Sequence, residues 1–185
     1  NMKYPHGTII EYADTDVIKD HYKLWKQAWY QASNGWVLAP EGTCSTVSEA
    51  IAYGMLISVY MDDQEVFKNL YNTWTSNSVG ANGGMNWRIG CSGGTGTASD
   101  ADFDAALALV MASKQWNDAS YLTAGKSLIT WIASNDIGSN KIKPGNQWND
   151  GFNPSYTTTA NFQLYQDVAG GSWSSVISQA YTDLN

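Results

Sequence analysis

Residues 99–135 decide the fold class, and they read SDADFDAALALVMASKQWNDASYLTAGKSLITWIASN. Apolar side chains recur at steps of three and four residues in both halves of this stretch, which is the spacing of one face of an α-helix. These positions are Phe103, Leu107, Val110 and Met111 in the first half, and Leu122, Leu128, Ile129 and Ile132 in the second. Only Asn117 and Asp118 separate the halves, so the stretch predicts two antiparallel helices joined by a tight turn.

The same spacing continues on both sides of this stretch. We expect helices over residues 16–32, 46–61, 63–75, 100–116, 118–135, 158–168 and 172–184, with Asp14 or Thr15 capping the first and Ser99 the fourth. No segment alternates with a period of two, so we expect little sheet and an all-α fold of six or seven helices. Tight turns alternate with long, Gly-rich loops, which predicts a groove at the end where the long loops open.

Composition and charge exclude several classes of protein. The chain has 185 residues, with 10 Lys and Arg against 17 Asp and Glu, and a formal net charge of −7. Arg88 is the single arginine and the lysines are scattered, so we expect no nucleic-acid partner and no anionic membrane surface, both of which need clustered positive charge. No apolar run approaches the roughly 20 residues that span a bilayer. An excess of Trp and Tyr over Phe hints at surfaces on which sugars stack, although these residues also serve ordinary cores.

The two cysteines, Cys44 and Cys91, leave two alternatives open. They could be buried free thiols, or they could form one disulfide, because both lie in Gly/Ser/Thr-rich loops just ahead of helices that carry carboxylates. A disulfide would imply secretion, and an extracellular location is the one we expect. Together with His6 and His21, two cysteines give no metal-ligand spacing, so we expect no metal and no cofactor.

Glu49 is the first candidate for chemistry. It stands in the first turn of an otherwise apolar or small-residue helix, in the segment Thr46-Val47-Ser48-Glu49-Ala50. Spacing alone favours a capping box, in which Thr46 is the N-cap and Glu49 bonds back to its N–H group. The functional alternative is a carboxylic acid at the rim of an apolar cavity, where desolvation would raise its pKa and suit it to donate a proton.

The second candidate is the acidic segment Ser99-Asp100-Ala101-Asp102-Phe103-Asp104. A calcium loop of the EF-hand type is excluded, because it would need Gly at position 105 and Glu at 111, where Ala and Met stand. Acids in a first turn also stabilise the helix dipole, which accounts for one of the three. Asp100 and Asp104 point roughly the same way along a helix and Asp102 points elsewhere, so one or two acids are expected to face a cavity. Two carboxylates at the mouth of an aromatic groove are the working parts of a glycosidase.

Several motifs, in order along the whole chain, resemble family 8 glycoside hydrolases, which are inverting enzymes typified by bacterial endo-β-1,4-glucanases. The two main ones are Thr46-Val47-Ser48-Glu49-x-x-x-Tyr53-Gly54-Met55 and Ala98-Ser99-Asp100-Ala101-Asp102-x-Asp104. Shorter matches are Lys3-Tyr4-Pro5-x-Gly7, Met85-Asn86-Trp87, Lys143-Pro144-Gly145-x-x-Trp148, Asn153-Pro154-Ser155-Tyr156 and Trp173-x-x-Val176. The sequence departs from the family at Ala50 and Ala52, where glycines are usual.

The resemblance implies an (α/α)6 barrel, or the first half of one, and cleavage of a β-linked polysaccharide or oligosaccharide, with β-1,4-glucan as the expected substrate. By position it makes Glu49 the general acid and Asp100 the carboxylate that hydrogen-bonds the sugar at the cleavage point. Trp87, Trp148 and Tyr156 would contact glucosyl units. Chitosanase, xylanase or lichenase activity, and a non-catalytic carbohydrate-binding remnant, are the alternatives.

The sequence is shorter than a full barrel of this family. Residues 1–185 correspond to part of a single catalytic domain, at roughly half the length of a complete barrel, and the family's catalytic base lies in a downstream Tyr-Asp-Ala-type segment that this sequence lacks. A half barrel would leave an apolar flank open, which soluble monomers rarely do. We therefore expect either a second polypeptide that completes the barrel or a longer working protein.

Overall fold

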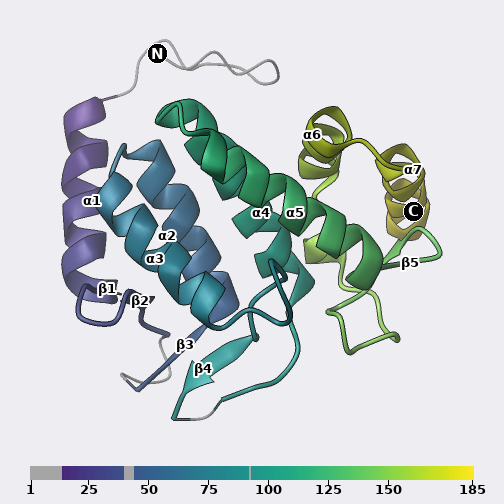
Figure 1. Ribbon diagram of the computed structural model, residues 1–185, viewed down its shortest axis with the longest axis horizontal. Coiled ribbons are helices and arrows are strands. Elements are labelled where there is room, and N and C mark those ends of the chain that lie inside the picture. The colour runs from purple at the N-terminus through teal and green to yellow at the C-terminus, as the bar shows by residue number, and fades with distance from the viewer. Residues whose placement is uncertain (1–13, 40–43, 92) are drawn as a thin grey trace.

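The computed structural model describes residues 14–39, 44–91 and 93–185, and this part of the chain is mainly helical (Figure 1). It contains seven α-helices: α1 (Thr15–Trp29), α2 (Ser48–Tyr60), α3 (Gln64–Ser76), α4 (Ser99–Gln115), α5 (Ala119–Asn135), α6 (Thr159–Ala169) and α7 (Trp173–Leu184). The expected all-α class and helix number are confirmed. The Lys3–Gly7 motif lies outside the described residues.

The sheet content is small, as expected, and consists of three antiparallel strand pairs. The strands are β1 (Tyr30–Gln31) with β2 (Trp36–Val37), β3 (Ser45–Val47) with β4 (Arg88–Gly90), and β5 (Ile137–Gly138) with β6 (Lys141–Ile142). The first helix ends at Trp29, three residues before the expected end, because the chain there turns into the β1–β2 pair. A 3₁₀ turn, η1 (Pro154–Tyr156), precedes α6.

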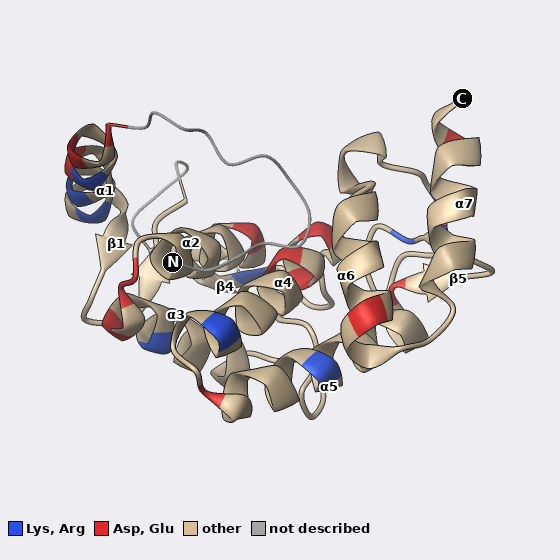
Figure 2. Cartoon of the chain, turned by 90° about the horizontal axis from the view of Figure 1, so that it is seen from above, with Lys and Arg blue, Asp and Glu red and all other residues tan. Residues whose placement is uncertain are grey.

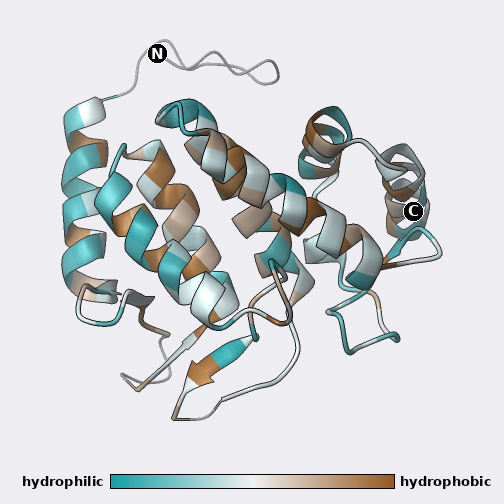
Figure 3. Cartoon of the chain, in the orientation of Figure 1, coloured by the Kyte–Doolittle hydropathy of each residue, from teal (hydrophilic) through white to brown (hydrophobic). Residues whose placement is uncertain are grey.

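Two central helices, α2 and α4, pack against each other and are covered by α3 and α5 on the same side (Figure 1). The hairpins α2–α3 and α4–α5 therefore form an inner and an outer layer, as in an (α/α)6 barrel, although the described helices do not close into a ring. Alanines at positions 101, 105, 106, 108 and 112 of α4 are all buried, and their small side chains let neighbouring helices approach closely. Figure 3 shows the apolar character of α2 beside the more polar α1 and α3.

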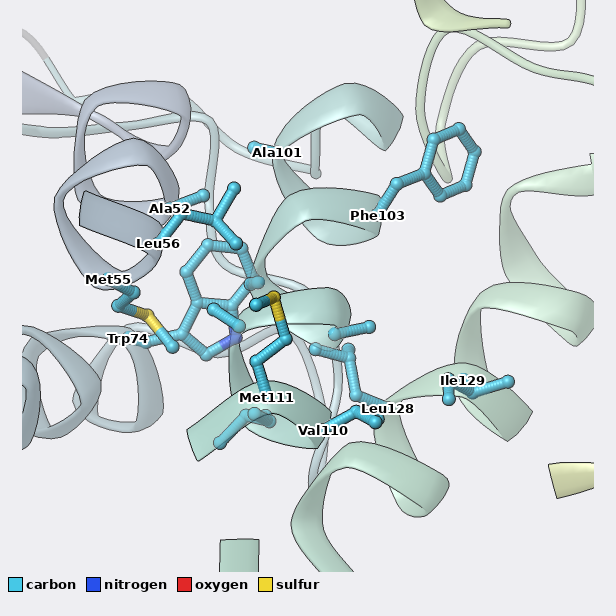
Figure 4. Packing of buried hydrophobic residues seen from close by; sticks show 14 of the residues in the cluster. Ala52, Met55, Leu56, Trp74, Ala101, Phe103, Val110, Met111, Leu128 and Ile129 are labelled. Atoms are coloured by element: carbon cyan, nitrogen blue, oxygen red, sulfur yellow. The ribbon is translucent and has the colours of Figure 1, made fainter. Parts of the chain in front are cut away.

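The core lies where α2, α3, α4 and α5 meet. In Figure 4 the Trp74 indole of α3 lies between Met55 and Leu56 of α2 and Met111 of α4, with Leu128 of α5 beyond. All of these side chains are at most 9% exposed. Each large apolar side chain buried in this way contributes about 1.5–3 kcal/mol relative to an exposed one, so the two hairpins are held together mainly by this cluster.

Helix α1 is attached differently from the other helices. Asp14 is its N-cap and accepts hydrogen bonds from the N–H groups of Asp16 and Val17, which confirms one of the two expected caps. None of its residues is buried. A groove of about 420 Å³ runs between α1 and α2, and its lining is almost entirely apolar: Trp25, Trp29, Val37, Leu38, Ala50, Tyr53, Leu56, Ile57 and Tyr60.

Tight turns close both hairpins at the end where α2 and α4 finish. Asp62 and Asn117 each adopt a left-handed conformation, with φ of 58° and 51°. The indole N–H of Trp116 donates to the Asp62 carboxylate at 2.7 Å and ties the two turns together. None of the described helices has the length and apolar character needed to cross a membrane.

Candidate active site

A cleft of about 460 Å³ opens at the N-terminal ends of α2 and α4, which is the end where the long loops meet. The expected groove is therefore present. Its lining residues are Ala39, Val47, Ser48, Glu49, Ala50, Tyr53, Trp87, Ala98, Asp100 and Tyr156. Figure 2 shows acidic segments of α2 and α4 on the same side of the chain. Four of the five predicted catalytic and sugar-contacting residues thus come together in one cleft, from segments far apart in the sequence.

The β3–β4 pair positions Glu49. Thr46 lies opposite Ile89, and the Ser48 N–H donates to the Trp87 carbonyl at 3.0 Å, so the same ladder holds the start of α2 and the loop that carries Trp87. The predicted capping box is wrong: Val47 occupies the N-cap position without a side-chain bond, and the Thr46 hydroxyl donates to the Val37 carbonyl instead. Glu49 therefore has no capping role in the structure.

The Glu49 carboxylate is exposed at the rim of the cleft and has Tyr53 one helical turn beyond it. The two side chains share a hydrogen bond. Partial burial, together with the nearby charge of Glu49, raises the pKa of Tyr53 to about 12, so its phenol stays protonated at neutral pH. Sequence reasoning gave Tyr53 no role, although its spacing of four residues from Glu49 places both on one helix face.

Asp100, in the first turn of α4, lies deeper in the cleft than Glu49. Burial, and then the negative charge of Glu49, raise the pKa of Asp100 above its ordinary value, while hydrogen bonds from the Ala101 backbone N–H and, to a smaller extent, from Tyr156 lower it. Its Oδ1 atom is buried and has no hydrogen-bond partner among the described residues. A half-buried carboxylate that lines a cleft is suited to bind a hydroxyl group of a ligand.

Asp104 extends this acidic face by one turn, as the helical spacing predicted. It is hydrogen-bonded to Asn161 of α6, and burial together with the charge of Asp100 raises the pKa of Asp104 to about 6. Asp102 points the other way and is fully buried. Of the three acids, Asp100 lines the cleft, Asp104 is half-buried outside its lining, and Asp102 is buried, so one of the one or two acids expected to face a cavity does so.

Asp102 meets a second buried acid, Asp136, at the C-terminal end of α5. Burial and the partner's negative charge raise the pKa of Asp102 well above its ordinary value, and burial raises that of Asp136 to about 7. The Thr97 hydroxyl donates to Asp136 at 3.4 Å, and the Asp102 carboxyl packs against Gly84, where a Cβ atom would overlap it. Ser99, the expected cap, is instead the first helical residue, and Ala98 takes the cap position.

The aromatic residues divide into two groups. Trp87 and Tyr156 line the cleft, as expected, and Tyr53 joins them. Trp148 is not among the lining residues. Its backbone N–H donates to the Gly145 carbonyl at 3.2 Å, its ring lies over Gly145, and the residue is 41% exposed. Sugar contact at Trp148 therefore remains a prediction.

Cys44 and Cys91 are both free thiols and both exposed in this structure, so the alternative of buried thiols is wrong. They face each other across the end of the β3–β4 pair, where the Cys91 N–H donates to the Cys44 carbonyl at 2.9 Å. The disulfide stays a prediction. Within the described ranges, no group of three or more His, Cys, Asp or Glu residues is arranged to hold a metal ion.

Comparison with known proteins agrees with the geometry. Endoglucanase 2 of Ruminiclostridium josui is 34% identical over 206 residues, which cover 98% of this chain and 44% of that protein. The structure of a β-1,3-1,4-glucanase from Paenibacillus sp. X4 superposes with a TM-score of 0.82 at 27% identity, covering 90% of this chain and 50% of the other. The endo-β-1,4-glucanase of Acetobacter xylinum, at 19% identity and a TM-score of 0.79, shares the fold.

The chain spans about half the length of the relatives it matches, and these relatives do not support the expected second polypeptide. Residues 1–184 match the family described as glycosyl hydrolases family 8. This match covers nearly the whole sequence and includes both motifs that supply the acids of the cleft. The chain belongs to glycosyl hydrolases family 8.

Proposed function

We propose that this chain forms part of an inverting, endo-acting glycoside hydrolase that cleaves β-1,4-glucan, with Glu49 as the general acid. One observation carries the proposal: Glu49 and Asp100 line a single cleft together with Trp87 and Tyr156. An open cleft with an acid at its rim suits attack within a polymer, because the polysaccharide can lie across it. Family membership and relatives named as endoglucanases support the same reading.

Each residue has a definite task in this proposal. Glu49 protonates the glycosidic oxygen as the bond breaks. Asp100, which lines the cleft, accepts a hydrogen bond from the sugar at the cleavage point through its carboxylate and so helps to hold that ring distorted. Trp87 and Tyr156 contact neighbouring sugar rings. Inversion also needs a carboxylate that activates water, and we assign that base to none of the described residues.

The substrate is proposed from the chemistry of the cleft and from the relatives. Two relatives are named as an endoglucanase and as a β-1,3-1,4-glucanase, so mixed-linkage glucan is the nearest alternative to β-1,4-glucan. Xylan and chitosan follow as further alternatives. A polymer of this kind cannot enter a cell, so we also propose that the protein acts outside it.

Exchange of Glu49 for Gln tests the proposal. Release of reducing ends is measured on carboxymethylcellulose, lichenan, xylan and chitosan, and binding of cellohexaose by calorimetry. Glu49→Gln should lower turnover by roughly 10²–10⁴-fold, because general acid catalysis contributes about that much, and should leave binding nearly unchanged. The matched control is Glu65→Gln, because Glu65 is likewise the second residue of an α-helix and exposed, but lies on α3 outside the cleft. It should leave both quantities unchanged.

Three results would count against the proposal. Equal losses of binding and turnover in Glu49→Gln would make Glu49 structural. Binding of cellohexaose without any turnover, measured on the whole glycoside hydrolase of which this chain is proposed to form part, would favour the non-catalytic carbohydrate-binding alternative. A product that first appears as the β-anomer by NMR would contradict inversion.

A further inference from the structure

We propose that Cys44 and Cys91 form a reversible disulfide that fixes β3 to β4, the strand pair that adjoins the cleft. The strand register supports this pairing. Ser45 lies opposite Gly90, so the next residues outward, Cys44 and Cys91, face each other across the antiparallel pair. The hydrogen bond of 2.9 Å between the Cys91 N–H and the Cys44 carbonyl holds the two backbones at this point.

Gly90 brings the two strands unusually close beside the cysteines. Its φ of +105° is a conformation that other residues rarely adopt, and a Cβ atom at this position would lie 2.8 Å from the Ser45 Cα and closer still to the Cys44 carbonyl. The neighbouring Arg88 guanidinium donates to the Ser45 hydroxyl at 3.2 Å across the same pair. The backbone around the cysteines is therefore already clamped before any covalent bond forms.

The thiols themselves are in contact and accessible. They share a hydrogen bond, and this bond raises the pKa of the Cys91 thiol. Both side chains are exposed, so a small oxidant can reach either sulfur. Two neighbouring, exposed thiols on clamped strands can approach the disulfide distance with little movement of the backbone.

A small-molecule disulfide, such as oxidised glutathione, serves as the oxidant. One cysteine thiolate attacks a glutathione sulfur and breaks its S–S bond, which gives a mixed disulfide and releases one glutathione thiolate. The second cysteine, as its thiolate, then attacks the protein sulfur of that mixed disulfide and expels the second glutathione. The two cysteines lose two protons and two electrons in total, and one oxidised glutathione becomes two molecules of the thiol.

The crosslink acts on the cleft because of what the two strands carry. β3 runs directly into the helix turn of Glu49, and β4 follows directly after Trp87. Fixing the strands therefore fixes the acid relative to an aromatic wall of the cleft. The effect of the disulfide on the cleft rests on the proposed function, whereas formation of the disulfide does not.

The test equilibrates the full chain with either dithiothreitol or excess oxidised glutathione. Oxidation should remove both reactive thiols, lower the mass by two hydrogen atoms and leave a monomer on non-reducing gels. It closes a loop of about 48 residues, so the melting temperature should rise by roughly 5–15 °C. The oxidised form should also bind cellohexaose roughly three- to tenfold more tightly, because the cleft is pre-organised.

Three variants serve as controls, and each has a defined result. With oxidised glutathione, Cys44→Ser and Cys91→Ser should each take up one glutathione at the remaining thiol and, like the double variant, show no gain in melting temperature from a closed loop. Two titratable thiols, glutathione on both cysteines, or disulfide-linked dimers in the oxidised wild type would overturn the proposal. Equal cellohexaose binding by both redox forms would overturn only the coupling to the cleft. Absence of binding in both forms would instead contradict the proposed function, and the thiol counts would still decide the disulfide.

Discussion

Three aspartates on one helix end have three different environments, although the sequence spaces them evenly. Asp100 lines the cleft, Asp104 is hydrogen-bonded to Asn161, and Asp102 is buried on the opposite side with Asp136. Helical geometry alone predicts that Asp102 differs from the other two. It does not identify Asn161 or Asp136 as partners, because those contacts depend on how distant helices pack.

Replacing Asp100 with Asn tests the electrostatic link within this cluster. The negative charge of Asp100 contributes to the raised pKa of Asp104, so Asp100→Asn should lower that pKa from about 6. The value should stay above the ordinary 3.8, because burial is the larger cause and remains. Carboxyl ¹³C NMR titration measures this directly. Asp150→Asn, in an exposed loop, is the control, and an unchanged titration of Asp104 in Asp100→Asn would contradict the link.

The helices and the site strands differ in how far the sequence predicts them. Each helix repeats its apolar spacing over several turns, so the pattern is strong and the ends shift by at most three residues. β3 and β4 have three residues each and pair across more than 40 residues of chain, which leaves no local signal. That pairing explains why Thr46 bonds to Val37 rather than capping α2, and why the predicted capping box is wrong.

Replacing Gly90 with Ala tests the close approach of β3 and β4. Gly90→Ala should lower the free energy of unfolding by roughly 2–4 kcal/mol, because the added methyl meets the Cys44 backbone and the residue keeps a positive φ. Gly80→Ala is the matched control: Gly80 also has a positive φ, of +75°, but nothing lies within 4 Å of the added atom. It should cost about 1 kcal/mol. Urea unfolding in dithiothreitol measures both, and equal losses would show that no clash exists at Gly90.

At the scale of the whole molecule, the Asp102–Asp136 pair joins α4, α5 and the loops behind the cleft. Lys143 lies near Asp136, and its ammonium group donates to the Asn135 carbonyl at 2.6 Å. The folded pair has raised pKa values, so it holds protons that the unfolded chain releases near pH 4. Its contribution to stability is therefore present at low pH and is lost as the pH rises from about 4 to about 7.

Asp136→Asn should reduce the loss of stability between pH 4 and pH 7, because the amide cannot ionise. Between pH 4 and pH 8, the free energy of unfolding of the variant should rise relative to that of the wild type by on the order of 2 kcal/mol. Chemical unfolding at several pH values gives the difference, and Asp150→Asn again provides the exposed control. A constant difference across this range would show that Asp136 is not protonated in the folded protein.

The joined turns at the far end of the hairpins have an evolutionary consequence. The Trp116–Asp62 bond and the buried cluster hold the two hairpins together at the end away from the cleft. Loop residues at the cleft end that lie outside the β3–β4 pair can therefore accumulate substitutions while the frame stays intact. A scaffold divided in this way favours diversification, and it makes loop grafting between homologues a practical route to new specificities.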